Sequence, residues 1–263
     1  MTRITRLFET LQRENRCGII AYLTAGDPTP EATPALVAAL ERGGADLIEL
    51  GVPFSDPIAD GPVIQQAGER ALRAGTTLSK VLKIAAEIRK TSEIPLLLFT
   101  YLNPALRYGF ERLARDAKAA GIDGCLLTDV SVEEARDYVK TMRAADLDTV
   151  FLAAPTSTDA RLRLVAEYSS GFIYLVSRTG ITGEQKTVSE SAMPLIERMR
   201  AHTDLPLAMG FGISKPEHVA ELASKVEAVV IGSAIVRQIE RDSSKLEAFM
   251  RDLKRPITRA TIS

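Results

Sequence analysis

Short apolar runs recur along the chain, and most of them are followed by a helical pattern of apolar positions. Each run is apolar on both faces, which is typical of strands that are covered on both sides. The eight predicted strands are Ile19–Thr24, Asp46–Gly51, Pro95–Thr100, Asp123–Thr128, Asp148–Ala153, Phe172–Ser177, Leu205–Gly210 and Glu227–Gly232. The predicted helices between and after them are residues 30–42, 78–90, 110–120, 131–143, 158–168, 190–201, 215–224 and 244–254.

This alternation predicts a parallel sheet with right-handed crossovers, and eight units in 263 residues indicate an α/β fold of the closed (β/α)8 TIM-barrel type. An open doubly wound sheet is the main alternative, but the turn after the first strand lacks its Gly-x-Gly-x-x-Gly pattern. Residues 2–14 predict an extra N-terminal helix, and we expect extra short helices in the βα loops. No linker divides the chain, so residues 1–263 are predicted to form a single barrel domain.

Composition and charge narrow the classes of function. With 46% hydrophobic residues, 25% charged residues and a formal net charge of −1, the chain has no basic block that would support nucleic-acid binding. Its two isolated cysteines favour a reducing compartment. The first residues carry charges where a signal peptide needs an apolar core, and no run is long enough to span a bilayer. We therefore expect a cytoplasmic protein with no membrane contact.

One acid, Glu49, lies inside an otherwise apolar strand. Burying a carboxylate is costly, and such a cost is usually retained for chemistry. Burial should raise its pKa and suit it to proton transfer near neutrality. The alternative is a structural ion pair; no basic residue lies between Arg42 and Arg70, so that partner would have to come from another strand.

A stiff loop rich in proline and glycine follows this strand and carries Asp56 and Asp60. Asp60 precedes Gly61 and an apparent helix, so the local pattern fits helix capping and catalysis alike. Asp56, before Pro57, fits an exposed turn or a contact with a partner chain.

Two glycine-containing turns follow the last two strands and predict a phosphate site. They are Gly210–Ser214 and Gly232–Ile235, and the second opens a helix, where backbone N–H groups and the Ser233 hydroxyl would face an anion. Residues 179–183 have similar chemistry and predict a lid. The alternative for these segments is a set of simple tight turns.

Aromatic residues gather near the predicted strand ends, although the chain has few aromatics and no Trp. They are Tyr22, Tyr101, Tyr174 and Phe211. Each alone fits core packing, but together they suggest walls for a flat apolar ligand.

The residues that are missing also restrict the chemistry. Both histidines fall outside the predicted strands, which disfavours a histidine-based zinc site or a Ser–His relay, and we expect no metal. No predicted strand contains Lys, which disfavours a Schiff base. Carboxylate acid–base chemistry on a phosphorylated substrate remains.

Over essentially its whole length the chain resembles the alpha subunit of tryptophan synthase. The motifs that carry the resemblance are Leu47–Pro62, Ser177–Gly183, Gly210–Ser214 and Gly232–Val236, and Tyr22–Pro28 is similar to the family's first strand and loop. Ser131 departs from the proline that many relatives have there, and Tyr22 stands where Phe is also common.

The resemblance implies retro-aldol cleavage of indole-3-glycerol phosphate to indole and glyceraldehyde 3-phosphate, with no cofactor in this chain. Glu49 would be the acid–base residue that protonates C3 of the indole, and Asp60 would accept a hydrogen bond from the indole N–H. The other implied residues are Tyr22, Tyr101, Leu126, Leu152, Tyr174 and Phe211 around the ring, and Gly183, Gly212, Gly232 and Ser233 around the phosphate.

The family works with a beta subunit that carries pyridoxal phosphate and receives indole through a tunnel, so the resemblance implies an α2β2 heterotetramer. Pro53 and Asp56 would then lie at the interface. Two alternatives are a stand-alone lyase that releases free indole and a barrel that has lost catalysis and only activates its partner. The presence of both Glu49 and Asp60 argues against the second, whereas the first needs the same active site and stays open.

Overall fold

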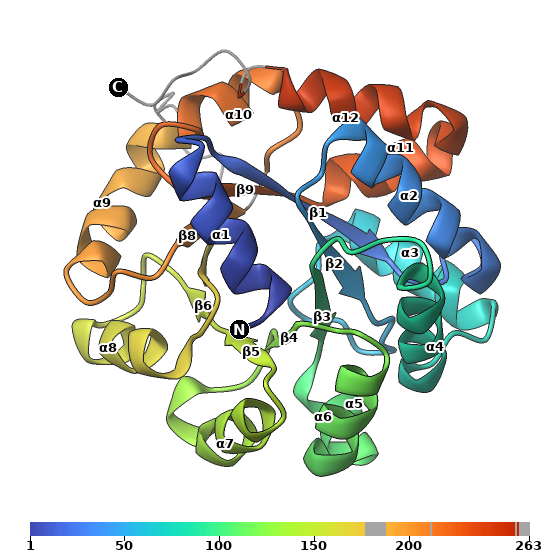
Figure 1. Cartoon of the computed structure of the whole chain (residues 1–263), viewed down its shortest axis with the longest axis horizontal. Helices are drawn as coiled ribbons and strands as arrows, with labels where there is room; N and C mark the ends of the chain where they lie inside the picture. The colour runs from blue at the N-terminus through green and yellow to red at the C-terminus, as the bar shows by residue number, and fades with distance from the viewer. Residues whose placement is uncertain (177–187, 211, 256, 258–263) are drawn as a thin grey trace.

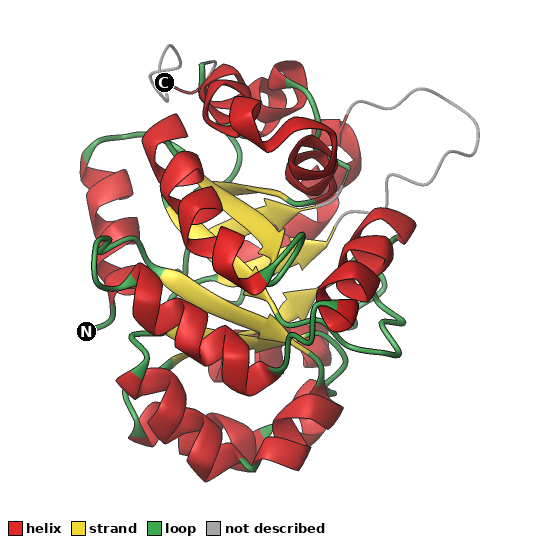
Figure 2. Ribbon diagram, turned by 90° about the vertical axis from the view of Figure 1, so that its right-hand side faces the viewer, coloured by secondary structure: helices red, strands yellow, loops and turns green. Residues whose placement is uncertain are grey.

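Parallel strands form a ring with helices around it in the computed structural model, which describes residues 1–176, 188–210, 212–255 and 257 (Figures 1 and 2). The strands are β1 (Gly18–Thr24), β2 (Leu47–Gly51), β3 (Leu96–Thr100), β4 (Gly124–Leu127), β5 (Asp148–Val150), β6 (Leu152–Ala153), β7 (Ile173–Val176), β8 (Leu207–Gly210) and β9 (Ala228–Ile231). The α-helices are α1 (Arg3–Arg13), α2 (Thr33–Gly43), α3 (Pro62–Arg73), α4 (Leu78–Ile88), α5 (Leu102–Tyr108), α6 (Phe110–Ala119), α7 (Arg136–Ala144), α8 (Asp159–Tyr168), α9 (Val188–Arg200), α10 (Pro216–Leu222), α11 (Ser233–Asp242) and α12 (Leu246–Lys254). The predicted TIM-barrel fold is confirmed.

The sheet runs in the order β5-β4-β3-β2-β1-β9-β8-β7-β6. All of its pairings are parallel. The single strand predicted over residues 148–153 is divided at Phe151: β5 pairs with β4, and β6 pairs with β7. The ring therefore closes through one stretch of chain that changes its partner halfway.

The N-terminal helix closes one end of the barrel. Thr2 caps α1 by accepting a hydrogen bond from the N–H of Thr5, and Ile4, Phe8 and Leu11 follow at helical spacing and are buried. Phe8 packs on Phe172 with ring centroids 5.5 Å apart, and the apolar face of α1 joins the residues that fill the barrel interior. Figure 1 shows α1 lying across the ring, at the end where the strands begin.

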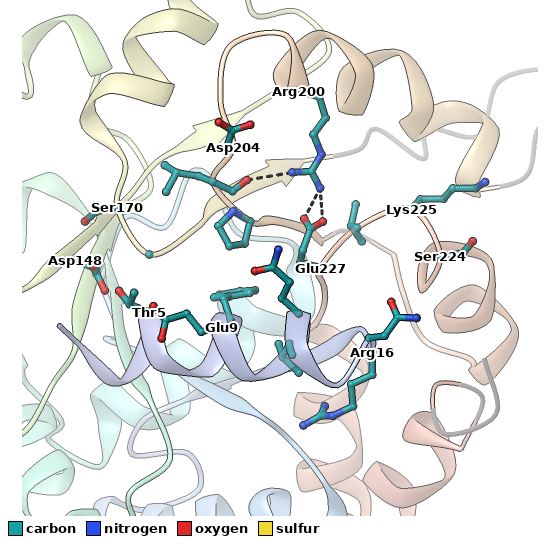
Figure 3. Close-up of a pocket in the computed structure, with 18 residues that line it drawn as sticks. Thr5, Glu9, Arg16, Asp148, Ser170, Arg200, Asp204, Ser224, Lys225 and Glu227 are labelled. Carbon is teal, nitrogen blue, oxygen red and sulfur yellow. Dashed lines mark hydrogen bonds and ion pairs between the residues drawn. The ribbon is translucent and has the colours of Figure 1, made fainter. Parts of the chain in front are cut away.

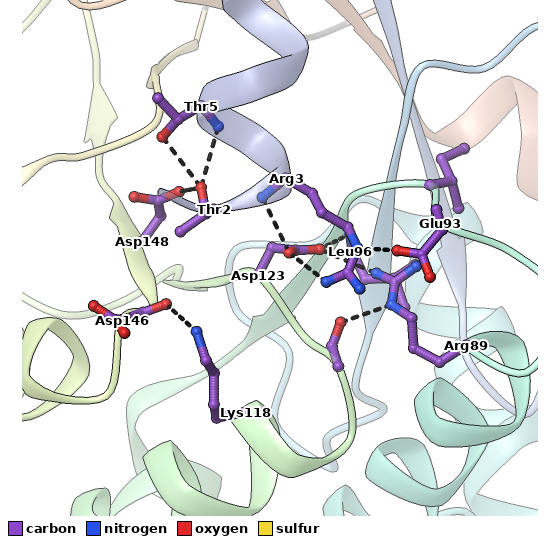
Figure 4. Close-up of polar contacts among 12 residues, drawn as sticks. Thr2, Arg3, Thr5, Arg89, Glu93, Leu96, Lys118, Asp123, Asp146 and Asp148 are labelled. Atoms are coloured by element: carbon purple, nitrogen blue, oxygen red, sulfur yellow. Dashed lines mark hydrogen bonds and ion pairs between the residues drawn. The ribbon is translucent and has the colours of Figure 1, made fainter.

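Acidic side chains bind the starts of the strands at this end (Figure 4). Asp123 accepts hydrogen bonds from the N–H of Leu96 (2.9 Å) and pairs with Arg3 (3.1 Å) and Arg89 (3.0 Å). Asp46 likewise accepts from the N–H of Ile19 (2.8 Å). Carboxylates thus satisfy two of the backbone donors near the strand starts, those of Ile19 and Leu96.

The βα loops contain the extra short helices that we expected, namely η1 (Pro30–Ala32), η2 (Val132–Glu134) and α5, which follows β3 directly; a further short helix, η3 (Ser243–Lys245), lies between α11 and α12. Ser131 lies at the start of η2, but its side chain makes no capping bond, because its hydroxyl donates to Glu133 instead. Among the described residues, none of the helices combines the length and the apolar character that a bilayer crossing needs.

Candidate active site

Strand alternation directs Glu49 into the barrel. Ile48 and Leu50 pack outward in the layer between sheet and helices, whereas Leu47 belongs to the interior cluster. Successive side chains of a strand point to opposite faces, so Glu49 shares the interior face with Leu47, one layer closer to the carboxyl end. Its neighbours in register are Tyr22 on β1 and Leu97 on β3.

Glu49 is a buried acid with an unused oxygen. The residue is 1% exposed, and its Oε1 atom has no hydrogen-bond partner in the described structure. Burial raises the pKa of its carboxyl from 4.5 to about 8. The ion pairs between described residues do not include Glu49, so the structure does not support a structural ion pair at this position. An orphaned carboxyl oxygen at this depth indicates a place for a substrate atom.

Asp60 does not cap the helix that follows it. The residue before α3 is Gly61, and no side chain makes a capping bond there, so the capping interpretation is wrong. Burial raises the pKa of the Asp60 carboxyl to about 6, and a hydrogen bond from the Tyr101 hydroxyl works in the opposite direction. Asp60 is therefore available for chemistry, with a pKa below that of Glu49.

Tyr101 holds the loop that carries Asp60. Its ring packs on Phe54 near the start of the loop, with centroids 5.2 Å apart, and its hydroxyl accepts a hydrogen bond from the N–H of Ala59 at 3.1 Å. Gln65 completes the support by donating from Nε2 to the carbonyl oxygen of Asp60 at 2.9 Å. The sequence reasoning predicted Tyr101 as a site residue and missed Gln65.

Aromatic rings surround the acids, and one of them was missed. Tyr22 is buried and meets Phe99 edge to face, with centroids 5.3 Å apart. Burial raises the pKa of both Tyr22 and Tyr174, and the nearby charge of Glu49 contributes in each case. Phe99 lies in β3, two residues before Tyr101, which directly follows that strand, so the alternation of faces was a signal that would have found it.

Two strand-end glycines make room for tyrosines. A Cβ atom at Gly51 would lie 2.3 Å from the hydroxyl oxygen of Tyr22, and one at Gly210 would lie 2.2 Å from that of Tyr174. These glycines are required by packing within the protein. The glycine at position 210, which opens one of the predicted phosphate turns, is thereby explained without a ligand.

Gly232 and Ser233 differ from those two glycines. A Cβ atom at Gly232 would meet Tyr22 at an ordinary 3.6 Å, so the protein itself does not require glycine there. Ser233 is the first residue of α11, directly after β9, and Gly212 has a left-handed φ of 72°. An open approach to a helix N-terminus suits an anion. Gly183 and Phe211 lie outside the described residues.

The remaining predicted positions can also be located. Leu126 is fully buried in the interior cluster, and Leu152 packs against it from β6. On the loop after β2, Asp56 is exposed, whereas Pro53 is buried, so in this conformation only Asp56 is accessible to another chain.

A cavity of about 830 Å³ lies at the other end of the barrel, beside α1 (Figure 3). Arg200 crosses its wall and pairs with Glu227, which in turn accepts a hydrogen bond from the N–H of Leu207 at 2.7 Å. The cavity is lined by residues that precede β7, β8 and β9, not by Glu49 or Asp60. In residues 1–176, 188–210, 212–255 and 257, no group of three or more His, Cys, Asp or Glu side chains is placed to hold a metal ion.

A closed barrel with a buried, unpaired acid towards the carboxyl ends of its strands has the architecture of the TIM-barrel enzymes, whose active sites lie at that end. The family model of the tryptophan synthase alpha chain matches residues 8–260. The tryptophan synthase alpha chain of Solibacter usitatus is 71% identical over 97% of this chain and 98% of its own length. That of Geotalea uraniireducens is 48% identical, over 91% and 90% of the two chains.

Solved structures agree. Tryptophan synthase subunit alpha from Legionella pneumophila superposes with a TM-score of 0.93 at 34% identity, covering 99% of this chain and all of the other. The aminoacrylate-bound tryptophan synthase of M. tuberculosis gives 0.90 at 34% identity, covering 98% of this chain. The chain belongs to the tryptophan synthase alpha chain family, as the sequence motifs predicted.

This family consists of carbon–carbon lyases that cleave indole-3-glycerol phosphate and pass the indole to a beta subunit. The alpha chain carries no cofactor of its own, and pyridoxal phosphate belongs to the beta subunit, which is a different chain.

Proposed function

We propose that Glu49 is the acid–base residue of this cleavage and that Asp60 stabilises the charge that develops on the indole ring. The observation that carries this assignment is the buried, unpartnered carboxyl oxygen of Glu49, which lies among Tyr22, Tyr174 and the interior apolar side chains.

The first step is proton donation to carbon. With a pKa of about 8, the Glu49 carboxyl is protonated at neutral pH and can give its proton to C3 of the indole. The ring becomes an iminium cation, which is an electron sink. When the hydroxyl on the adjacent side-chain carbon loses its proton, the bond from that carbon to C3 breaks and its electron pair returns to the ring. The products are indole and glyceraldehyde 3-phosphate, and the hydroxyl proton returns to Glu49.

Asp60 acts on the ring nitrogen. With a pKa of about 6, its carboxyl is ionised at neutral pH and accepts a hydrogen bond from the indole N–H, which becomes more acidic as the iminium forms. The Tyr101 hydroxyl supports the ionised state. The interaction is thus stronger in the transition state than in the bound substrate, as catalysis requires.

Gly212, Gly232 and Ser233 bind the phosphate at the start of α11, and Gly183 joins them from residues 177–187, which lie outside the described part of the chain. The open space over Gly232 supports this assignment, because a backbone N–H can approach an anion closely there. Leu126, Leu152 and the aromatic side chains, Phe211 included, enclose the ring.

The beta subunit docks on the loop after β2, through Asp56 and its neighbours. Ile58 on this loop is 74% exposed, and Leu106 on α5 is 54% exposed. Large apolar side chains presented to water near the catalytic end suit a partner that covers them. The buried Pro53 would act by stiffening the loop beneath that contact.

We place the protein in the cytoplasm. Cys17 and Cys125 are both free and buried, and burial raises the pKa of the Cys125 thiol to about 12. Unreactive, unpaired thiols fit a reducing compartment. Cell fractionation tests this location, and recovery in a membrane or secreted fraction would overturn it.

The test of the mechanism is formation of indole and glyceraldehyde 3-phosphate from indole-3-glycerol phosphate by the purified chain. Glu49→Gln should lower kcat by about a thousandfold, within the range for loss of a general acid–base. Asp60→Asn should lower it by about a hundredfold, as for loss of one charge-stabilising group. Glu69→Gln, on the exposed face of nearby α3, is the matched control and should leave kcat unchanged. Near-normal turnover by Glu49→Gln would refute the assignment.

The same assay with a beta subunit separates the complex from a stand-alone lyase. Added beta subunit should raise kcat, and Asp56→Lys should reduce that gain without changing the rate of the chain alone. A rate that does not respond to the beta subunit would favour the stand-alone lyase.

A further inference from the structure

Arg70 of α3 pairs with two acids from different parts of the chain. Its Nε and Nη2 atoms donate to the two carboxylate oxygens of Asp27 at 2.8 and 2.9 Å, and its Nη1 atom donates to Glu240 at 2.9 Å. The fork-shaped contact with Asp27 is the strong geometry for a guanidinium and a carboxylate. The guanidinium group of Arg70 thus binds one acid along one edge and a second acid with its remaining nitrogen.

These partners belong to the connections that follow three neighbouring strands. Asp27 lies in the loop after β1, Arg70 lies in the helix after β2, and Glu240 lies in α11, which follows β9. The order β2-β1-β9 in the sheet makes the three strands adjacent. Arg70 therefore links three connections at the carboxyl end of the barrel, where the active site lies.

The link is built on a packed contact. On the same face of α3, Ala67 meets Tyr22 and Val236 of α11 in a small apolar cluster. Asp27 is only 4% exposed, so without Arg70 its carboxylate would be buried and uncompensated. Gly26 reinforces this junction, because a Cβ atom there would lie 2.0 Å from the hydroxyl oxygen of Thr76, just beyond α3.

The linked elements carry the two ends of the proposed site. Asp60 ends the loop from which α3 begins at Pro62, and Ser233 is the first residue of α11. We infer that Arg70 is a positioning residue: by joining α3 to α11 and to the loop after β1, it fixes the distance between the Asp60 carboxylate and the phosphate-binding end of α11. The inference rests on the proposed function, since it assumes that the indole binds at the first place and the phosphate at the second.

A fixed distance matters only to a ligand that reaches both places. A substrate that spans the site gains affinity and reactivity from having its two binding groups held at the right separation, whereas a fragment that fills one end does not. Loss of Arg70 should therefore affect a two-ended ligand much more than either fragment. A general loss of structure would weaken all three ligands alike.

The experiment compares three probes on the wild-type chain and on Arg70→Met. The two-ended probe is an indole with an unbranched propyl phosphate at C3, which lacks the hydroxyls needed for cleavage; the fragments are indole and glycerol 3-phosphate. Arg70→Met should weaken the two-ended probe about tenfold or more and each fragment by less than about twofold, measured by NMR titration. It should also lower kcat/KM for cleavage by a similar or larger factor. Equal losses for all probes, or no loss, would overturn the inference.

Two further variants complete the design. Arg73→Met, one turn along α3, removes an arginine that is 70% exposed and whose contact, Glu69 at 3.7 Å, is also exposed; it should match the wild type with every probe. Glu240→Gln removes only the exposed arm to α11 and should give a smaller loss confined to the two-ended probe. If Arg70→Met does not fold, the Glu240→Gln variant decides the question. The inference is wrong if this variant binds the two fragments as much more weakly as it binds the two-ended probe, or if it binds all three probes like the wild type. Failure of the wild-type chain to bind or cleave would instead refute the proposed function.

Discussion

The two ends of this barrel use buried carboxylates in opposite ways. Where the strands begin, Asp123 is 4% exposed and is surrounded by donors, with the N–H of Leu96 and the guanidinium groups of Arg3 and Arg89 within 3.1 Å. Where they end, Glu49 is 1% exposed and one of its oxygens has no partner. Similar burial thus accompanies two different environments.

The difference shows that burial alone does not identify a catalytic acid. A carboxylate that is fully paired ties elements together, whereas a buried one without partners is driven towards its protonated form. At the first end, stability is gained. At the second, stability is given up to keep an acid without partners. In TIM barrels the two ends usually divide the roles of stability and activity in this way.

The largest effect should follow from removing the paired acid. Asp123→Ala removes the carboxylate that pairs with Arg89 and accepts from the N–H of Leu96. We expect it to lower the free energy of unfolding by about 3–5 kcal/mol. Urea unfolding monitored by circular dichroism measures this. The folded fraction should keep its kcat within about twofold, because Asp123 is at the opposite end from the chemistry. A loss of activity that exceeds the loss of folded protein would break the comparison.

Removing the unpaired acid should have the opposite effect on stability. The folded-state pKa of Glu49, about 8, lies above its ordinary 4.5, so the folded state holds a proton that the unfolded chain releases between these values. Wild-type stability from this group is therefore full below pH 4.5 and falls as the pH rises towards 8. Glu49→Gln should stabilise the protein at pH 8 by about 2–4 kcal/mol and by much less at pH 5. Urea midpoints at the two pH values test this, and a destabilised variant at pH 8 would contradict it.

A smaller effect should appear in the pH dependence of catalysis. We expect kcat/KM to rise as Asp60 ionises near pH 6 and to fall as Glu49 loses its proton near pH 8. Tyr101→Phe removes the hydroxyl that favours ionised Asp60, so the lower limb should move up by less than about one pH unit. Tyr108→Phe, which loses a bond to Asp116 on the outer surface, is the control. A lower limb that stays in place would remove Tyr101 from this role.

The smallest effect should come from Glu93, which pairs with the same Arg3 that binds Asp123. Glu93 is 79% exposed on its side chain, and exposed ion pairs contribute little. Glu93→Gln should leave the urea midpoint of unfolding, monitored by circular dichroism, close to that of the wild type. A loss of stability as large as that of Asp123→Ala would show that an ion pair contributes as much when it is exposed as when it is buried.

The strands and the burial of Glu49 could be predicted because their signal is local. The sequence itself shows a carboxylate among apolar neighbours at Glu49. It also shows regularly spaced runs that are apolar on both faces of the predicted strand. Every predicted strand is found within two residues of its expected bounds, apart from the division at Phe151.

Contacts between distant segments could not be predicted in the same way. The sequence does not show that the Tyr101 hydroxyl meets Ala59, that Arg70 meets Glu240, or that Asp60 leaves the start of α3 uncapped. Each depends on where separate segments of the chain lie once the ring has closed. Phe99 is a different case, because its spacing of two residues from Tyr101 is visible in the sequence and predicts that both face the barrel interior.

The strand that changes its partner at Phe151 has a consequence for assembly. Phe151 lies between β5 and β6, and a nascent chain that ends there contains only β1 to β5. In that chain β1 still lacks its partner β9 and presents an open edge with unpaired N–H and C=O groups. Each half of the ring is thus a template for the other. A gene cut between these two short segments should yield two polypeptides that recover a working barrel only when they are produced together.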